Sequence, residues 1–259
     1  MGLPPGDAPV GGDLVTASAK PAATLCLLCD DADGVRVLMA RRPDDSRFMA
    51  SAWVFPGGTL DPEDREAASS IAPEIPDLPW RLCALRELGE EVGIWLTRTG
   101  AAREPVDVAE LATDDLAPWA RWVTPEVLPI RYDARFYVAA VDEPVEPRID
   151  EELVDARWVR PGDALAAWER GDWELALPTR TTLAELASFP DVASVLAAAE
   201  DASLVPIVPR LVPDGDGLRL LRPGEPGYDE AAGYAEDPAF RARVLAAIDP
   251  GRPIPPSRP

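Results

Sequence analysis

An arginine and three glutamates lie within six consecutive residues, at Arg86, Glu87, Glu90 and Glu91. In a helix, which turns about 100° per residue, the three carboxylates project within an arc of about 100°. Like charges on one face repel one another unless a cation lies between them, and carboxylate oxygens suit Mg²⁺ or Mn²⁺. Such an ion can bridge phosphate oxygens and lower the pKa of a bound water. The alternative is a solvated acidic helix face, which explains most glutamate-rich stretches.

The residues around these glutamates predict a helix that packs on a sheet. Its apolar arc, opposite the carboxylates, consists of Leu78, Leu82, Leu85 and Val92. We expect Gly89 to mark the closest approach between the helix and sheet backbones. Pro79 suits the first turn of this helix, and Gly93 suits its end. Arg86 can pair with Glu90, four residues later, and so hold the geometry of the ligands.

The sequence contains no histidine, which narrows the mechanisms open to the site. Serine–histidine–aspartate catalysis and a histidine general base are both excluded. A carboxylate or a metal-bound water must therefore move the proton. Gly57 and Gly58, upstream of the glutamates, can bring a backbone carbonyl oxygen to the same metal ions.

This pattern resembles the signature of the Nudix hydrolases, Gly-x5-Glu-x7-Arg-Glu-U-x-Glu-Glu-x-Gly-U, in which U is aliphatic. The second half of the signature is matched at Arg86, Glu87, Leu88, Glu90, Glu91, Gly93 and Ile94. In the first half Asp64 stands where the family has glutamate, and 21 residues rather than seven separate it from Arg86. The additional fourteen residues, within 65–79, are predicted to form a surface insertion in the loop before the helix. Whether Asp64 takes the place of the family's first glutamate is left open.

A second resemblance is to the coenzyme A diphosphatase branch, especially the peroxisomal acyl-coenzyme A type with a similar insertion. It rests on residues 38–42 and 47–58 ahead of the signature and on residues 122–125, 131–137 and 177–183 after it. Ser51 and Pro43 depart from this branch, which has glycine and serine there. The resemblance implies coenzyme A or an acyl derivative as the favoured substrate. ADP-ribose, NADH and dinucleoside polyphosphates are the alternatives, and a non-catalytic Nudix-fold binding or sensor protein is the alternative of another class.

The family resemblance also implies the roles of individual residues. Mg²⁺ or Mn²⁺ would be held by Gly57, Gly58, Glu87, Glu90 and Glu91. The catalytic group would consist of Arg86, Glu87, Glu91 and Glu152, and one of the three glutamates would accept the proton of the attacking water. Glu152 is the acid expected from a loop outside the signature, and Asp150 and Glu151 are neighbours that can take its role. Substrate contacts are predicted at Arg41, Arg47, Phe55 and Arg135, with Arg42 and Arg180 as further candidates.

Charge and composition restrict the partners. A net charge of −21 argues against nucleic acid, because binding a polyanion needs a basic surface. We expect a small-molecule nucleotide diphosphate as substrate, which such an acidic protein can bind only through metal ions and a few placed arginines. No apolar run approaches 18 residues, so no membrane partner is expected. Three cysteines, an odd number, point to a reduced cytoplasmic location, and a homodimer stays open.

Alternating strands and helices predict an α/β fold, and the Nudix resemblance implies the same α/β/α sandwich with a mixed sheet. Residues 1–20, rich in Gly, Pro and Asp, are expected to be mobile. The Nudix hydrolase domain is expected over residues 21–200. A small C-terminal extension, residues 201–259, is predicted to contain a hairpin, a helix and a Pro-rich tail.

Overall fold

The computed structural model describes residues 17–46, 49–149, 152–215 and 217–247. The predicted substrate contact Arg47 and the acidic neighbours Asp150 and Glu151 lie outside these ranges. So do the first sixteen residues of the expected mobile segment and the whole Pro-rich tail. No helix in the described parts of the chain is both long enough and apolar enough to cross a membrane.

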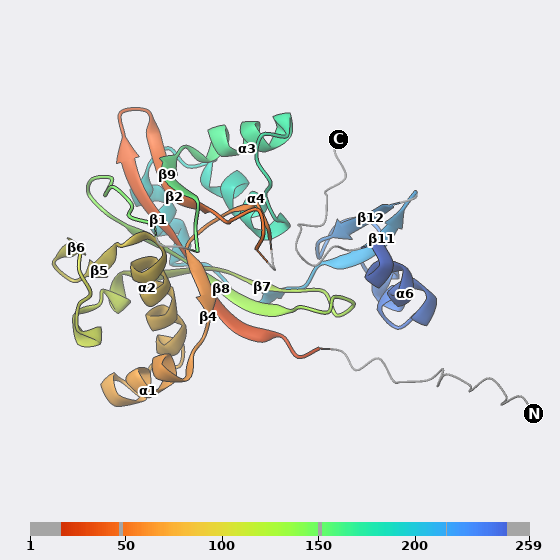
Figure 1. Ribbon diagram of the computed structural model, residues 1–259, viewed down its shortest axis with the longest axis horizontal. Coiled ribbons are helices and arrows are strands. Elements are labelled where there is room, and N and C mark those ends of the chain that lie inside the picture. Colours follow the sequence, from red (N-terminus) through yellow and green to blue (C-terminus); the bar gives the residue numbers. More distant parts are fainter. Residues whose placement is uncertain (1–16, 47–48, 150–151, 216, 248–259) are drawn as a thin grey trace, which may run out of the picture.

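A mixed sheet forms the centre of the molecule (Figure 1). Its strands are β1 (Lys20–Asp31), β2 (Gly34–Arg41), β3 (Trp53–Val54), β4 (Gly57–Thr59), β7 (Ala117–Val123), β8 (Tyr132–Ala140), β9 (Asp155–Val159) and β10 (Pro206–Ile207). The order is β10-β7-β8-β1-β2-β3, with β4 also paired to β1 and β9 to β2. Strand β1 is parallel to β8, and β10 is parallel to β7, whereas the other pairs are antiparallel.

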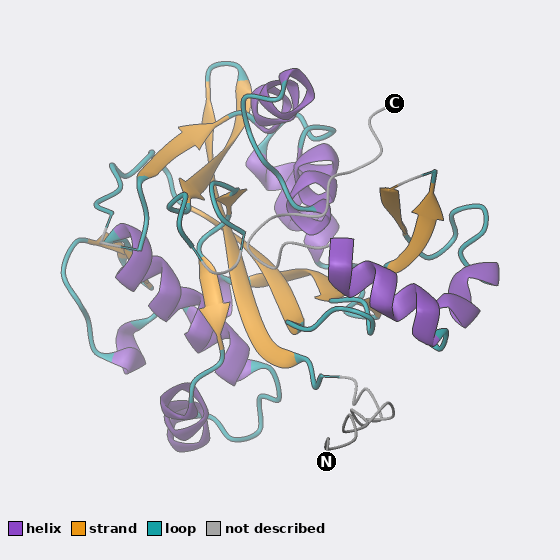
Figure 2. Ribbon diagram, turned by 45° about the vertical axis from the view of Figure 1, so that its right-hand side comes forward, coloured by secondary structure: helices purple, strands orange, loops and turns teal. Residues whose placement is uncertain are grey.

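Helices cover both faces of this sheet (Figure 2). They are α1 (Pro62–Ile71), α2 (Leu78–Val92), α3 (Pro161–Arg170), α4 (Leu177–Leu186) and α5 (Val192–Ala199). Side chains alternate along a strand, so β1 contributes to two cores. Leu25 and Leu27 pack with α2 in one core, whereas Cys26 and Leu28 pack with α3, α4 and α5 in the other. The three layers confirm the predicted α/β/α sandwich.

Helix α2 begins and ends where the sequence predicted. Pro79 lies in its first turn, and Gly93 ends it in the left-handed conformation, with φ of 64°. Gly89 is needed for a different contact from the one expected. A Cβ atom at this position would lie 2.5 Å from the indole ring of Trp95, so the close approach is to a side chain and not to the sheet backbone.

Residues 65–79 were predicted to be a surface insertion in a loop, but the first part of this segment belongs to helix α1. This helix packs on α2, and Ala68 is only 3% exposed within the same core. Its alanine-rich composition suits a helix as well as a loop, because alanine has the highest helix propensity. Replacing residues 67–76 by a short linker would therefore remove part of the core.

Several smaller elements differ from the sequence-based expectations. Two single 3₁₀ turns, η1 (Val108–Glu110) and η2 (Thr113–Asp115), follow one another along the chain. The hairpin of β5 (Trp95–Thr97) and β6 (Gly100–Ala102) was not predicted.

The C-terminal extension follows the predicted order. It contains the hairpin of β11 (Arg210–Asp214) and β12 (Gly217–Leu221), the 3₁₀ helix η3 (Glu230–Ala235) and helix α6 (Pro238–Ala247). Strand β10, which precedes the hairpin, was not expected to join the main sheet.

Candidate active site

Two glycines allow the signature helix to approach strand β4. Gly57 and Gly58 pair with Thr24 and Ala23 of β1. A Cβ atom on Gly58 would lie 2.3 Å from the Oε1 atom of Glu87, and one on Gly57 would lie 2.5 Å from the carbonyl oxygen of Ala23. The Gly57 amide donates a hydrogen bond of 2.9 Å to Oε2 of Glu91. The glycines therefore let two carboxylates of α2 contact the backbone of β4.

Glu87 and Glu91 are buried beside this strand. Glu91 is 5% exposed, and the side chain of Glu87 is 14% exposed. Burial raises the pKa of Glu91 to about 8; the Gly57 hydrogen bond opposes this rise and the charge of Glu87 adds to it. Burial likewise raises the pKa of Glu87 to about 6, against the lowering effect of Arg86. Two buried carboxylates that disfavour each other's charge are the kind of donor set that a cation stabilises.

Arg86 connects Glu87 and Glu90 of α2 with Asp64 of α1. Its Nη1 atom donates to Oε2 of Glu90 at 2.8 Å, which confirms the predicted pair, and to Oε1 of Glu87 at 3.0 Å. Its Nε and Nη2 atoms donate to the two carboxylate oxygens of Asp64 at 3.1 and 3.0 Å. Asp64 is 4% exposed and thus acts as the buried partner of Arg86. Arg86 is accordingly a positioning residue, which fixes where α2 presents Glu87.

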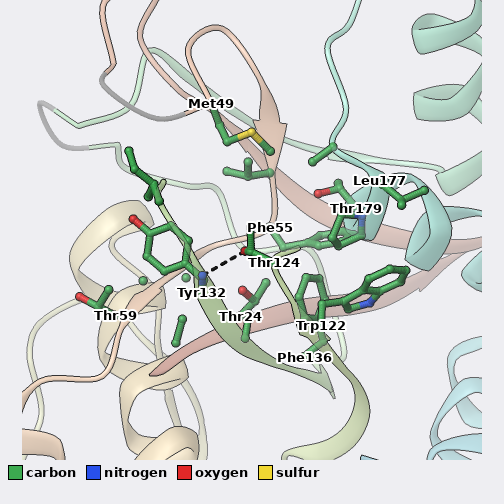
Figure 3. A pocket seen from close by; sticks show the side chains of 18 of the residues that line it. Thr24, Met49, Phe55, Thr59, Trp122, Thr124, Tyr132, Phe136, Leu177 and Thr179 are labelled. Carbon is green, nitrogen blue, oxygen red and sulfur yellow. Dashed lines mark hydrogen bonds between the residues drawn. The ribbon is translucent and has the colours of Figure 1, made fainter. Parts of the chain in front are cut away.

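A cavity of about 450 Å³ opens next to Glu87 and Glu91, a volume within the usual range for small-molecule sites. Its floor comes from the sheet, with Thr24 on β1, Trp122 on β7 and Phe136 on β8 (Figure 3). Phe55, a predicted substrate contact, also lines the cavity and packs edge to face on Phe136 with ring centroids 6.3 Å apart. The predicted acid Glu152 lines it as well, and its charge raises the pKa of Glu91.

Among the described residues, the arginine that lines this cavity is Arg42, a further candidate in the sequence, and not its neighbour Arg41. Arg42 lines the cavity, and its buried Nε atom has no hydrogen-bond partner among the described residues. Arg41 is outside the cavity lining and forms an ion pair of 2.7 Å with Asp44. Successive side chains of an extended chain point to opposite faces of a sheet. Arg41 ends β2 and Arg42 follows it directly, so the two side chains point in different directions.

The other arginine candidates are also placed by their contacts. Ala134 and Phe136 of β8 line the cavity, so Arg135 between them faces α2, where its guanidinium carbon lies 3.6 Å from the ring centroid of Trp80. Arg180 stacks on Trp168 at 4.4 Å and is outside the cavity lining. Arg41 and Arg135 thus lie outside the cavity lining, and their contact with substrate stays a prediction.

The donor set fits a divalent ion through two of the three predicted glutamates. Glu87 and Glu91 line the cavity and Glu90 does not, although Arg86 bonds both Glu87 and Glu90. Within the ranges that the structure describes, no group of three or more acidic or cysteine side chains is close enough to hold an ion. Two carboxylates still suit Mg²⁺, which keeps several waters when it binds.

The raised pKa of Glu91 predicts how stability depends on pH when no divalent ion is present. The folded-state pKa of about 8 lies above the usual 4.5, so between these values the folded protein binds more protons than the unfolded chain. This carboxyl group therefore lowers the free energy of unfolding as pH rises from about 5 to about 8. Chemical denaturation in EDTA should show that the free energy of unfolding decreases less between about pH 5 and about pH 8 for Glu91→Gln than for the wild type. Identical pH profiles for the two proteins would contradict this prediction.

Several cavity residues were missed because they come from distant segments. Trp122 and Tyr132 lie on neighbouring strands, and Thr124, in the connection between them, accepts a hydrogen bond of 3.0 Å from the Tyr132 amide (Figure 3). Pro209 and Leu220 come from the C-terminal extension. Strand alternation could have indicated Trp122, whereas nothing in the sequence indicates that the extension reaches the cavity.

Comparison with known proteins shows the family. The family model of the NUDIX domain matches residues 19–177, more than half of the chain. A Caenorhabditis elegans protein with the provisional name nudix hydrolase 7 is 29% identical over 200 residues. The match covers 68% of this chain and 63% of that protein, so the chain spans less than two thirds of this relative's length. The human acyl-coenzyme A diphosphatase is 25% identical over 284 residues, which cover 80% of this chain and 76% of that protein.

A solved structure agrees with this assignment. The crystal structure of a NUDIX hydrolase from Alicyclobacillus acidocaldarius matches with a TM-score of 0.63 at 28% identity, covering 74% of this chain and 100% of that one. The matched domain includes β4 and α2, which carry the glycines and the glutamates of the cavity. The chain therefore belongs to the Nudix family, whose hydrolases act on diphosphate-bearing substrates and generally use divalent metal ions.

Proposed function

We propose that this protein hydrolyses the diphosphate bond of a nucleoside diphosphate derivative with Mg²⁺ or Mn²⁺, and that coenzyme A or acyl-coenzyme A is its favoured substrate. The observation that carries the proposal is one cavity lined by two buried glutamates, a partnerless arginine nitrogen and a largely apolar remainder. The glutamates suit a cation, and Arg42 suits phosphate oxygens. The human acyl-coenzyme A diphosphatase supports the substrate class.

Each charged residue at the cavity has a separate role in this proposal. Glu87 and Glu91 would hold the divalent ion, which when bound neutralises phosphate charge and makes water a better nucleophile. Arg42 would bind phosphate oxygens and orient the diphosphate for attack. Glu152 would accept the proton of the attacking water, because Glu87 and Glu91 are then committed to the ion. Arg86, held by Asp64, keeps Glu87 in position.

A substrate screen with metal removal tests the proposal. We expect hydrolysis with Mg²⁺ or Mn²⁺ and its loss after exhaustive chelation, because the buried carboxylates cannot share a site with a diphosphate without a cation. Mass spectrometry should show products cleaved at the diphosphate, with kcat/KM for coenzyme A or acyl-coenzyme A at least about tenfold above that for ADP-ribose or NADH. Activity that survives chelation would refute the metal mechanism. Preference for another diphosphate would refute the coenzyme A assignment alone.

A further inference from the structure

The C-terminal extension supplies part of the cavity wall. Pro209, just before β11, and Leu220 on β12 line the cavity together with the start of α4 at Leu177 and Pro178. The charged residues that line it are Arg42, Glu87, Glu91 and Glu152, and none of them belongs to the extension. In Figure 1, α2 and the β11–β12 hairpin lie on opposite sides of the connection from β7 to β8. The cavity thus has a charged end and, at the extension, an apolar end that the hydroxyl of Thr179 on α4 also borders.

A small separate core fixes this apolar end. Val127, in the loop between β7 and β8, is buried together with residues of the extension, namely Leu211, Phe240 and Val244. Leu128, the next loop residue, both packs on this core and lines the cavity. Figure 1 shows the loop reaching towards α6 and the hairpin. The extension therefore holds the loop in place as well as contributing its own side chains.

The C-terminal extension is joined to the main sheet through its first strand, β10. Strand β10 pairs with β7 through Pro206 and Ile207, which lie opposite Arg121 and Trp122. Trp122 is itself a cavity residue. The hairpin thus follows within a few residues of a strand that borders the site, so its position relative to the floor of the cavity is set by the sheet.

We infer that the C-terminal extension builds a subsite for an unbranched aliphatic tail carried by the substrate beyond its diphosphate. This inference rests on the proposed function, because the charged end must hold the diphosphate for a tail to reach Leu220. Apolar walls without a charged or hydrogen-bonding side chain from the extension favour methylene groups over sugars or nucleobases, whose polar atoms would lose their bonds to water. Each buried methylene raises affinity by about fourfold at most.

Two leucines on one strand allow a matched test. Leu218 and Leu220 lie on the same face of β12, both are half-buried and both pack on the small core, but only Leu220 lines the cavity. We expect wild-type kcat/KM to be at least about tenfold higher for octanoyl-coenzyme A than for coenzyme A. Leu220→Asn should lose most of this ratio, whereas Leu218→Asn should keep it. Leu220→Ala carries the comparison if the asparagine variant does not fold.

The outcomes separate this inference from the proposed function. Equal kcat/KM for octanoyl-coenzyme A and coenzyme A would overturn the subsite but not the proposed hydrolase activity. The same holds if both leucine variants lose the preference for octanoyl-coenzyme A equally. If no diphosphate is hydrolysed, the proposed function fails, and calorimetric binding with Mg²⁺ present decides the subsite. Tighter binding of octanoyl-coenzyme A than of coenzyme A, lost only in the Leu220 variants, supports it. Equal affinity for both compounds overturns it.

Discussion

Glu91→Gln is expected to lower kcat about a hundredfold or more and to raise the melting temperature of the metal-free protein. The glutamine keeps the shape of the side chain and can still accept the hydrogen bond from the Gly57 amide, but it removes one of the two buried carboxylates proposed to hold the ion. Stability should increase, because burial raises the pKa of Glu91 to about 8 and its charged form is therefore unfavourable in the fold. Melting at pH 8.5 in EDTA, where the wild-type carboxylate is charged, measures this gain.

A glutamate outside the cavity provides the control. Glu66 lies exposed on α1 and does not line the cavity, so Glu66→Gln should leave both kcat and the melting temperature unchanged. Adding Mg²⁺ should raise the melting temperature of the wild type and of Glu66→Gln, but much less that of Glu91→Gln. If Glu91→Gln retains kcat within about threefold of the wild type, the loss of transition-state stabilisation is below 1 kcal/mol and the metal role of Glu91 is refuted.

The sequence predicts those features that depend on local rules. Helix α2 is delimited by Pro79 and by Gly93 in the left-handed conformation, and both positions follow from backbone preferences. The pairing of Arg86 with Glu90 follows from helical spacing. Helix α1 was not predicted, because alanine and serine in a segment rich in proline are typical of loops as well as of helices. Only its packing on α2 favours the helix over a loop.

Long-range contacts could not be predicted from the same rules. Asp64 meets Arg86 only because α1 folds back on α2, 22 residues along the chain. The small core of the C-terminal extension needs Val127, which is more than eighty residues away from Leu211, so no local pattern connects the loop with the hairpin. Helical spacing also did not show that only Glu87 and Glu91 of the three carboxylates line the cavity, or that one Arg86 nitrogen holds both Glu87 and Glu90.

Arg42→Ala is expected to lower kcat/KM for coenzyme A about ten- to a hundredfold, with little change in melting temperature. A charge-assisted hydrogen bond to phosphate is worth about 1.5 to 3 kcal/mol, and the Nε atom of Arg42 has no hydrogen-bond partner among the described residues that the substitution would remove. Lysine should restore activity only in part, because its point charge cannot bind two oxygens at once. Arg41→Ala is the matched control: this neighbour pairs with Asp44 outside the cavity lining and should cost less than about threefold. Equal losses in the two alanine variants would show that Arg42 contributes only general positive charge, which contradicts its assignment as the phosphate contact.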